Sequence, residues 1–438
     1  MCRENRRHLT AITLPRASVV LCTIAIAVLA ASLEGAQGLP QTFNPPNPSY
    51  QERFGSSVAI DGNNVLIGAA GYGSAIGQVH LFDASNGDLL RTFNNPAAAS
   101  YDEFGGSLAI DGNRVLIAEP GDDTNGDHSG QAHLFDAASG NLLHTFGATV
   151  AGEHDSFGGS VAIDGNNVLI GAAYDSSNGY EVGQAHLFNA SNGQLVRTFN
   201  DPTVTQWDQF GCSVAIDGSN VVIGAIGDDT KGRDVGQVHL FDAASGNLLR
   251  TFNDPTVTSK DYFGYSVAIS GNNVLIGAVM DDTNGADAGQ AYLFNATTGD
   301  LLHIFDDPTP AERNRFGDSL AISGNNVLIG AMCDDTSGSN VGQAYLFDAS
   351  TGDLLQTFDD PTATSSDYFG DSVAIDGEKV LIGATGNDIP FRTNSGQAHL
   401  FDVPEPATMS LLALGAIAVL RRRRKPCGQT PSGRPRRC

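Results

Sequence analysis

The sequence has few cysteines and few basic residues. Two of its six cysteines, Cys212 and Cys333, lie in the body of the chain at unrelated positions, so no disulfide is predicted. Lys and Arg number 24 against 49 Asp and Glu, which gives a formal net charge of −25. A chain this acidic repels nucleic acid and anionic lipid head groups, so nucleic acid is not expected as a partner.

The sequence also lacks the common catalytic motifs. It contains no Gly-x-Ser-x-Gly nucleophile elbow, no His-Glu-x-x-His zinc motif and no Gly-x-x-x-x-Gly-Lys-Ser/Thr phosphate loop. Its many carboxylates follow an internal repeat, whereas an active site normally breaks such symmetry. We therefore predict a protein that is not an enzyme and that requires no cofactor.

Long apolar runs are confined to the two ends of the chain. Near the N-terminus, four arginines precede an apolar run over residues 17–31, and small residues follow at 35–36. This order predicts a secretory signal peptide over residues 1–36. An uncleaved anchor helix is the alternative, but about 15 residues fall short of the roughly 20 that span a bilayer.

At the other end, Pro404, Glu405 and Pro406 precede an apolar segment over residues 410–420 and a basic cluster. The cluster consists of Arg421, Arg422, Arg423 and Arg424, followed by Lys425. A basic flank of this kind stays in the cytoplasm, which leaves the body of the chain on the far side of the membrane.

This order of features resembles the PEP-CTERM sorting signal of Gram-negative bacteria. The resemblance implies that residues 403–425 form a sorting segment with a short transmembrane helix, and that residues 426–438 form a basic cytoplasmic tail. It also implies that an exosortase-type protease recognises the Pro-Glu-Pro motif. The protein would then pass from an inner-membrane anchor to the outer surface, envelope or extracellular matrix. A plain single-pass anchor is the alternative and predicts the same topology.

Between the two ends, one unit recurs seven times. Each copy begins with Phe-Gly, and successive copies are 50 residues apart once and then 53 residues apart five times. The copies begin at Phe54, Phe104, Phe157, Phe210, Phe263, Phe316 and Phe369. In the third copy, turns rich in Gly, Asn and Asp separate four β-type runs, at residues 160–163, 168–172, 183–188 and 194–199.

Four short strands per unit, with no helical period, predict a blade of a β-propeller. Residues 37–402 are therefore expected to form an all-β fold, a seven-bladed β-propeller of four-stranded antiparallel blades. A β-helix is an alternative, but its repeats are much shorter. A row of separate domains is another, but a four-stranded sheet of about 53 residues cannot bury both of its faces alone.

Closure of the ring can be predicted from the ends of the repeat region. The seventh unit ends at residue 402 and lacks a fourth strand. Residues 39–43 match residues 354–358, which form the fourth strand of the sixth unit. The N-terminal strand is therefore predicted to complete the last blade, where Pro40 fits an outer edge that needs no donor.

The segments Phe-Gly-x-Ser-Val-Ala, Val-Leu-Ile-Gly-Ala and Gly-Gln-Ala-Tyr-Leu-Phe resemble the FG-GAP repeat of integrin α-chain propellers and their bacterial relatives. The resemblance covers residues 39–402 and implies the seven-bladed fold. The chain departs from the family at two points. The proline of the Gly-Ala-Pro segment survives only at Pro120, and the Asp-rich hairpin that holds calcium in the family is shortened to Asp-Gly-Asn-Asn.

The loops between the second and third strands of the units are acidic. Asp, Asn and Thr side chains clustered around Gly offer the oxygen ligands that Ca²⁺ binds. The same residue types also form ordinary turns through side-chain-to-backbone hydrogen bonds, and this turn interpretation is favoured. The candidate ligands for weak calcium binding are Asp122, Asp123, Asn125 and Asp127.

One strand position carries histidine in five units and tyrosine in two. Because the residue changes and occurs once per blade, we expect packing between blades, with a ring nitrogen bonded to the backbone, rather than a shared metal. The residues at this position are His80, His133, His186, His239, Tyr292, Tyr345 and His399.

Together these features predict a secreted, monomeric binding or structural protein of the matrix or adhesion type. Its partner would be an extracellular protein or a polysaccharide, held by the loops of one propeller face. The alternative is an extracellular hydrolase or lyase that acts on polysaccharide in the central channel. Two weak breaks in the repeat symmetry bear on this alternative, Glu119-Pro120 and Arg313 with Arg315.

Overall fold

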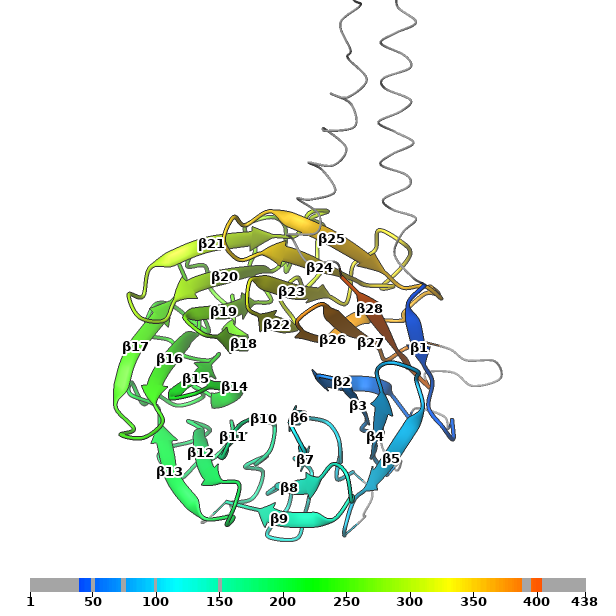
Figure 1. Ribbon diagram of the computed structural model, residues 1–438. Coiled ribbons are helices and arrows are strands. Elements are labelled where there is room, and N and C mark those ends of the chain that lie inside the picture. The colour runs from blue at the N-terminus through cyan, green and yellow to red at the C-terminus, as the bar shows by residue number, and fades with distance from the viewer. Residues whose placement is uncertain are drawn as a thin grey trace, which may run out of the picture. The chain divides into compact units, whose positions relative to one another are not determined.

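Seven four-stranded antiparallel sheets surround a common axis, like the blades of a propeller (Figure 1). The computed structural model describes residues 39–48, 52–71, 76–97, 101–148, 152–387 and 395–403, and none of these residues is helical. All the strands belong to one unit, which begins at Pro40. The predicted all-β, seven-bladed fold is confirmed. The predicted signal peptide and the sorting residues from Pro404 onward lie outside the described residues.

In blades 1 to 6 the strands follow chain order from the axis outward. Blades 1 to 4 consist of β2 (Phe54–Asp61), β3 (Asn64–Ala69), β4 (Gln78–Asp83) and β5 (Leu89–Asn94); β6 (Leu108–Asp111), β7 (Arg114–Glu119), β8 (Gln131–Asp136) and β9 (Leu142–Phe146); β10 (Ser160–Asp164), β11 (Asn167–Ala172), β12 (Gln184–Asn189) and β13 (Leu195–Asn200); and β14 (Phe210–Asp217), β15 (Asn220–Ala225), β16 (Gln237–Asp242) and β17 (Leu248–Asn253).

Blades 5 to 7 repeat the same plan. They consist of β18 (Phe263–Ser270), β19 (Asn273–Ala278), β20 (Gln290–Asn295) and β21 (Leu301–Asp306); β22 (Leu320–Ser323), β23 (Asn326–Ala331), β24 (Gln343–Asp348) and β25 (Leu354–Asp359); and β26 (Phe369–Asp376), β27 (Lys379–Ala384), β28 (Gln397–Asp402) and β1 (Gln41–Phe43). The innermost strand of each blade contacts those of both neighbours, and β2 contacts β26, so the ring is closed.

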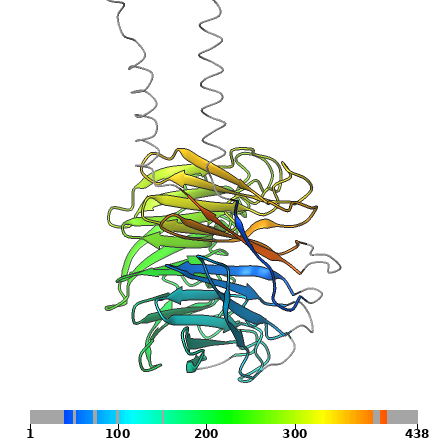
Figure 2. The same cartoon turned by 45° about the vertical axis from the view of Figure 1, so that its right-hand side comes forward.

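The N-terminal strand closes the seventh blade, as predicted. β1 pairs antiparallel with β28, and Thr42 lies opposite His399 just as Thr357 lies opposite Tyr345 in blade 6. Figures 1 and 2 show β1, in blue, beside β28, in orange-red. The strand is shorter than the five residues that match the repeat, because it begins after Pro40, whose nitrogen cannot donate to a ladder.

Apolar side chains fill the spaces between blades rather than the blades themselves. Between blades 3 and 4, Leu187 and Phe199 pack against Phe210, Val214 and Phe241 of the next blade. The Phe199 and Phe241 rings are 5.1 Å apart, and the Phe210 ring meets Phe241 edge-on at 6.0 Å. Each core cluster draws on two blades, so a single blade has no complete core of its own.

The Phe-Gly-x-Ser motif links one blade to the next. Phe210 is fully buried, and Gly211 has φ +94° with no room for a side chain, because a Cβ would come 2.3 Å from the Gln184 carbonyl oxygen. The Ser213 hydroxyl donates to the Gly264 carbonyl of the following blade. Six junctions share this bond, made by Ser57, Ser160, Ser213, Ser266, Ser319 and Ser372, and the last of these closes onto Gly55.

Candidate binding face

The antiparallel order of the strands sorts the loops onto two faces. Tight hairpins after the first and third strands of each blade lie on one face. The loops between the second and third strands, and the loops that join consecutive blades, lie on the other, which we call the long-loop face. Loops of this kind tolerate variation while a rigid scaffold positions them, so this face is the candidate binding surface.

At five junctions of the described residues, the same backbone bond ties two loops of the long-loop face together. The Trp207 nitrogen donates to the Tyr180 carbonyl at 3.0 Å, and the Lys260 nitrogen donates to the Arg233 carbonyl at 2.9 Å. The residue at the Trp207 position has a left-handed backbone at six junctions, with φ between 65° and 73°. These equivalent residues are Tyr101, His154, Trp207, Lys260, Arg313 and Ser366. The backbone is therefore constant, while the exposed side chain changes from junction to junction.

A cavity of about 620 Å³ opens on this face over blade 4, among the loop that enters the blade, its β15–β16 loop and the loop that leaves it. Trp207, Asp229, Arg233 and Tyr262 contribute to its lining. Trp207 is the single tryptophan of the chain, its side chain is 51% exposed, and its ring meets that of Tyr180 edge-on at 4.5 Å. An exposed aromatic pair beside a cavity with charged residues combines an apolar platform with hydrogen-bonding groups.

Beneath the long-loop face lies a layer of buried carboxylates. Two junctions each bring three aspartates together, with one ligand oxygen of each within 4.8 Å of the others: Asp201, Asp208 and Asp228, and then Asp254, Asp261 and Asp281. Among the described residues, no Lys or Arg forms an ion pair with these six carboxylates. Burial raises the pKa of Asp208 and of Asp254 to about 6.

Threonine hydroxyls join these carboxylates across the two loops. The Thr203 hydroxyl lies 2.8 Å from both the Asp201 and the Asp228 carboxylates, and Thr256 lies 3.0 Å from those of Asp254 and Asp281. The Asp-Asp-Thr segments of the sequence therefore turn their first aspartate inward. There it fixes the loop that joins two blades and does not face solvent.

The five histidines that share one strand position are buried between blades, as predicted, but their hydrogen-bond partners differ from those expected. The Nδ1 atom of each histidine lies 3.0–3.1 Å from a threonine hydroxyl on the neighbouring outer strand, as for His239 and Thr251. The expected bond to backbone is thus a side-chain bond, because the register places a threonine opposite each histidine. Burial lowers the pKa of His80, His186 and His399 to about 4.

Glu119 and Arg315, one residue from each break in repeat symmetry, form contacts within the protein. Glu119 is fully buried and bonds the Nε2 atom of His133, and burial raises the pKa of its carboxyl group. Arg315 lies 2.9 Å from Asp318 and 5.9 Å from the centre of the Tyr265 ring. Burial raises the pKa of Asp318 to about 6. Arg313, in contrast, occupies the exposed loop position that Trp207 holds two junctions earlier.

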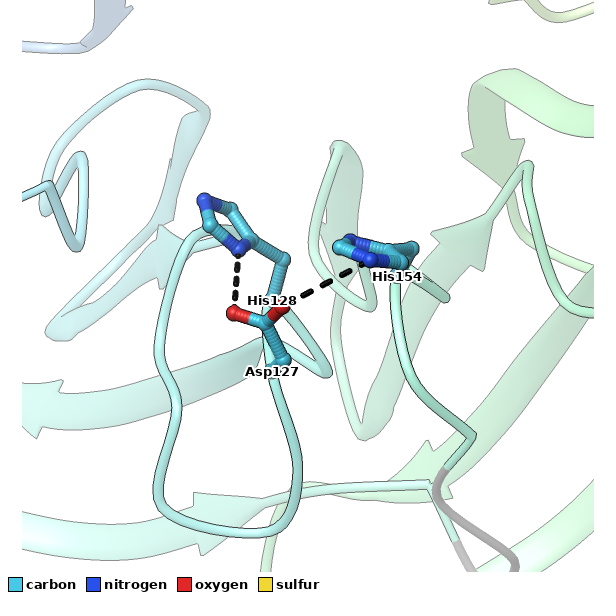
Figure 3. A group of neighbouring side chains, drawn as sticks. All are labelled: Asp127, His128 and His154. Atoms are coloured by element: carbon cyan, nitrogen blue, oxygen red, sulfur yellow. Dashed lines mark hydrogen bonds and ion pairs between the residues drawn. The ribbon is translucent and has the colours of Figure 1, made fainter.

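The four candidate calcium ligands are divided between two groups. Asp122 is buried beside Asp102 and Glu119, whereas Asp127 is exposed beside His128 and His154 (Figure 3). The Asp123 carboxylate accepts the His128 backbone N–H at 2.7 Å, and Asn125 lies on the exposed part of the loop. Calcium binding at these four residues stays a prediction.

The two histidines beside Asp127 were not predicted as part of any site. His154 lies 27 residues further along the chain, on the loop that enters blade 3. The repeat could have indicated this pairing. In equivalent loops, the residue at the Asp127 position lies against the residue at the His154 position of the following loop. Cys212 and Cys333, the two cysteines among the described residues, are free.

The seven sheets and their closure define the molecule as a β-propeller. The FG-GAP repeat model matches six segments that together exceed half of the chain, at residues 96–135, 145–188, 204–241, 255–294, 309–347 and 360–401. The chain therefore belongs to the FG-GAP repeat family. The PEP-CTERM protein-sorting motif matches residues 402–425, which indicates export and sorting to the cell envelope of a Gram-negative bacterium by exosortase-type machinery.

No curated protein matches the chain. Within the described residues, no helix has the length and apolar character needed to cross a membrane.

Proposed function

We propose that this chain is a non-enzymatic, extracellular binding protein that holds a polysaccharide on its long-loop face. The observation that carries the proposal is the half-exposed Trp207, which lies beside Tyr180 and lines the cavity over blade 4. Sugar rings have an apolar face and a rim of hydroxyl groups. An aromatic platform with carboxylate, amide and guanidinium groups around it offers contacts to both.

Polysaccharide is favoured over a protein partner by the kind of surface present. The aromatic platform is small and polar groups surround it, whereas protein interfaces usually bury a larger apolar core. A sorting signal that brings the protein to the envelope also places it where cell-surface polysaccharides are found. The charged residues on the cavity wall, Asp229, Arg233 and Asp234, would set which sugars are accepted.

Binding of glycans by the Trp207→Ala variant tests this proposal. We expect the wild-type protein to bind a subset of surface polysaccharides on a glycan array, and the variant to lose at least tenfold in affinity because the stacking platform is gone. Tyr101→Ala is the matched control, since it removes an exposed aromatic side chain from an equivalent backbone position with the same φ of 73°. Equal binding by wild type and Trp207→Ala would refute the site, and binding only to proteins would refute the ligand class.

For the hydrolase or lyase alternative, we consider the Arg315–Asp318 pair near the inner strands of blades 5 and 6. Asp318 is held by an ion pair and takes no part in the Trp207 cavity. Under our proposal, prolonged incubation with a bound polysaccharide releases no new reducing ends or unsaturated sugars. Release that disappears in Asp318→Asn would show an enzyme instead.

We further infer that the sorting tail is cut during export. In the exported wild-type protein, mass spectrometry should find no peptides beyond the Pro-Glu-Pro motif, whereas replacing Pro404, Glu405 and Pro406 by alanine should leave the tail attached. Pro426→Ala lies outside the recognition motif and serves as the control. Recovery of full-length tails from the wild-type surface would mean that the segment acts as a permanent anchor.

A further inference from the structure

Asp127, His128 and His154 form an exposed group on the long-loop face at the junction of blades 2 and 3 (Figure 3). The Nδ1 atom of His128 lies 3.0 Å from Asp127 Oδ1, and the Nε2 atom of His154 lies 3.5 Å from Asp127 Oδ2. The two imidazole rings are 5.6 Å apart, centre to centre. Thus one carboxylate lies between two imidazole nitrogens that belong to different loops.

We propose that this group binds a borderline divalent transition-metal ion such as Zn²⁺. Two imidazole nitrogens and one carboxylate oxygen form a ligand set that Zn²⁺, Ni²⁺ and Cu²⁺ accept, whereas Ca²⁺ requires six to eight oxygens. Ligand atoms on a tetrahedral zinc ion are about 3.3 Å apart, as follows from bond lengths near 2.0 Å. The distances of 3.0 and 3.5 Å, which run to the two different oxygens of the Asp127 carboxylate, are close to this separation, and one ligand atom from each residue lies within 4.8 Å of the other two.

The backbone holds the three side chains in register. The His154 nitrogen donates to the Asp127 carbonyl at 2.7 Å, and the Ser156 nitrogen donates to the His128 carbonyl at 3.1 Å. The two histidines have left-handed backbones, with φ of 49° and 65°. Since four other junctions have the same pair of backbone bonds, the approach of the two loops is a property of the propeller and does not depend on a metal. The ion needs only small rotations of exposed side chains.

The ligand set occurs at this junction alone among the described residues. The positions equivalent to His128 and His154 carry Glu181 with Trp207, and Asp234 with Lys260, in the next two junctions. Asp123 adds a nearby oxygen, because its Oδ1 atom lies 3.7 Å from His128 Nδ1. The three side chains are 49–66% exposed, so a bound ion keeps positions open to solvent and can take a hydroxyl or carboxylate oxygen from a second molecule.

Metal titration of the purified full chain, with its cysteines alkylated and without an affinity tag, tests the proposal. We expect one Zn²⁺ per chain in calorimetry, and visible absorption bands of tetrahedral cobalt when Co²⁺ is added. His154→Ala and Asp127→Asn should each weaken binding at least tenfold and remove the cobalt bands, since each deletes one ligand. Acidification should release the ion, because imidazole must be neutral to bind it.

His303→Ala is the matched control, because it removes a partly exposed histidine from an outer strand and should leave the affinity unchanged. All variants should melt at the wild-type temperature in the absence of metal, as the three ligands are exposed. Zn²⁺ affinity equal in wild type and His154→Ala, or no binding up to millimolar Zn²⁺, would overturn the proposal. Trp207→Ala should retain Zn²⁺ binding, so failure of the polysaccharide proposal and failure of this one are distinguishable.

Discussion

A chain that begins at residue 44 will unfold at a much lower temperature than a chain that begins at residue 39. The truncation removes β1, whose Phe43 is 97% buried and packs against Phe82 with the rings 5.0 Å apart. Loss of one buried phenylalanine side chain costs about 3–5 kcal/mol. The truncation also leaves β28 as an unpaired edge and removes Thr42, the hydrogen-bond partner of His399.

Thermal unfolding of the two chains, followed by circular dichroism, measures this effect. Phe43→Ala in the longer chain isolates the packing contribution from the loss of strand pairing, and its melting temperature should fall between those of the two chains. Leu39→Ala is the control, because Leu39 is fully exposed and contributes no buried surface. Coincident melting curves for chains that begin at residues 39 and 44 would show that β1 does not close the ring.

Replacement of Asp254 by asparagine will stabilise the protein more at pH 8 than at pH 4.5. Burial raises the pKa of Asp254 to about 6, above the value of 3.8 for an unperturbed aspartate. A raised pKa in the folded state means that the protonated group is favoured, so its stabilising contribution is complete below pH 4 and is lost as the pH rises through 6. Asparagine does not titrate and avoids this loss.

The expected size of the difference follows from the pKa shift. Two pKa units correspond to about 3 kcal/mol over the whole pH range, and part of this is already lost at pH 4.5, so the free energy of unfolding of Asp254→Asn relative to wild type should rise by about 2 kcal/mol from pH 4.5 to pH 8. Urea unfolding at both pH values, with EDTA present to remove cations, provides the measurement. Asp88→Asn, on an exposed hairpin, is the control. A relative stability that does not change with pH would mean that the carboxylate is compensated in the folded state.

The fold was predictable because every blade needs the same residue types at the same positions, which produces a fixed repeat length in the sequence. Phe210 and Gly211 illustrate this, since the buried ring and the left-handed glycine are required at every junction and recur at a fixed spacing. Closure was predictable for the same reason, because the match of residues 39–43 to residues 354–358 identifies a strand missing from the last unit. The sequence repeat therefore predicts the contacts that occur in every blade, and these contacts make up most of the core.

The candidate site was predictable only in its location. Asp122 and Asp127 look alike in the sequence, yet one turns inward toward Glu119 and the other outward toward His154. Whether such a side chain turns inward or outward depends on which loop of the neighbouring blade packs against it. The identity of a single residue does not predict that packing. The histidine partners were missed for a related reason, because Thr251 becomes the partner of His239 only through the register of β16 and β17.

Hydrogen exchange of the backbone amides in β1 tests the central claim, that seven blades form one ring closed by the N-terminal strand. If the ring is closed, peptides covering residues 41–43 exchange as slowly as peptides covering residues 356–358, which hold the equivalent place in blade 6. Exchange of residues 41–43 at the rate of an unstructured peptide, with residues 356–358 protected, would contradict the account.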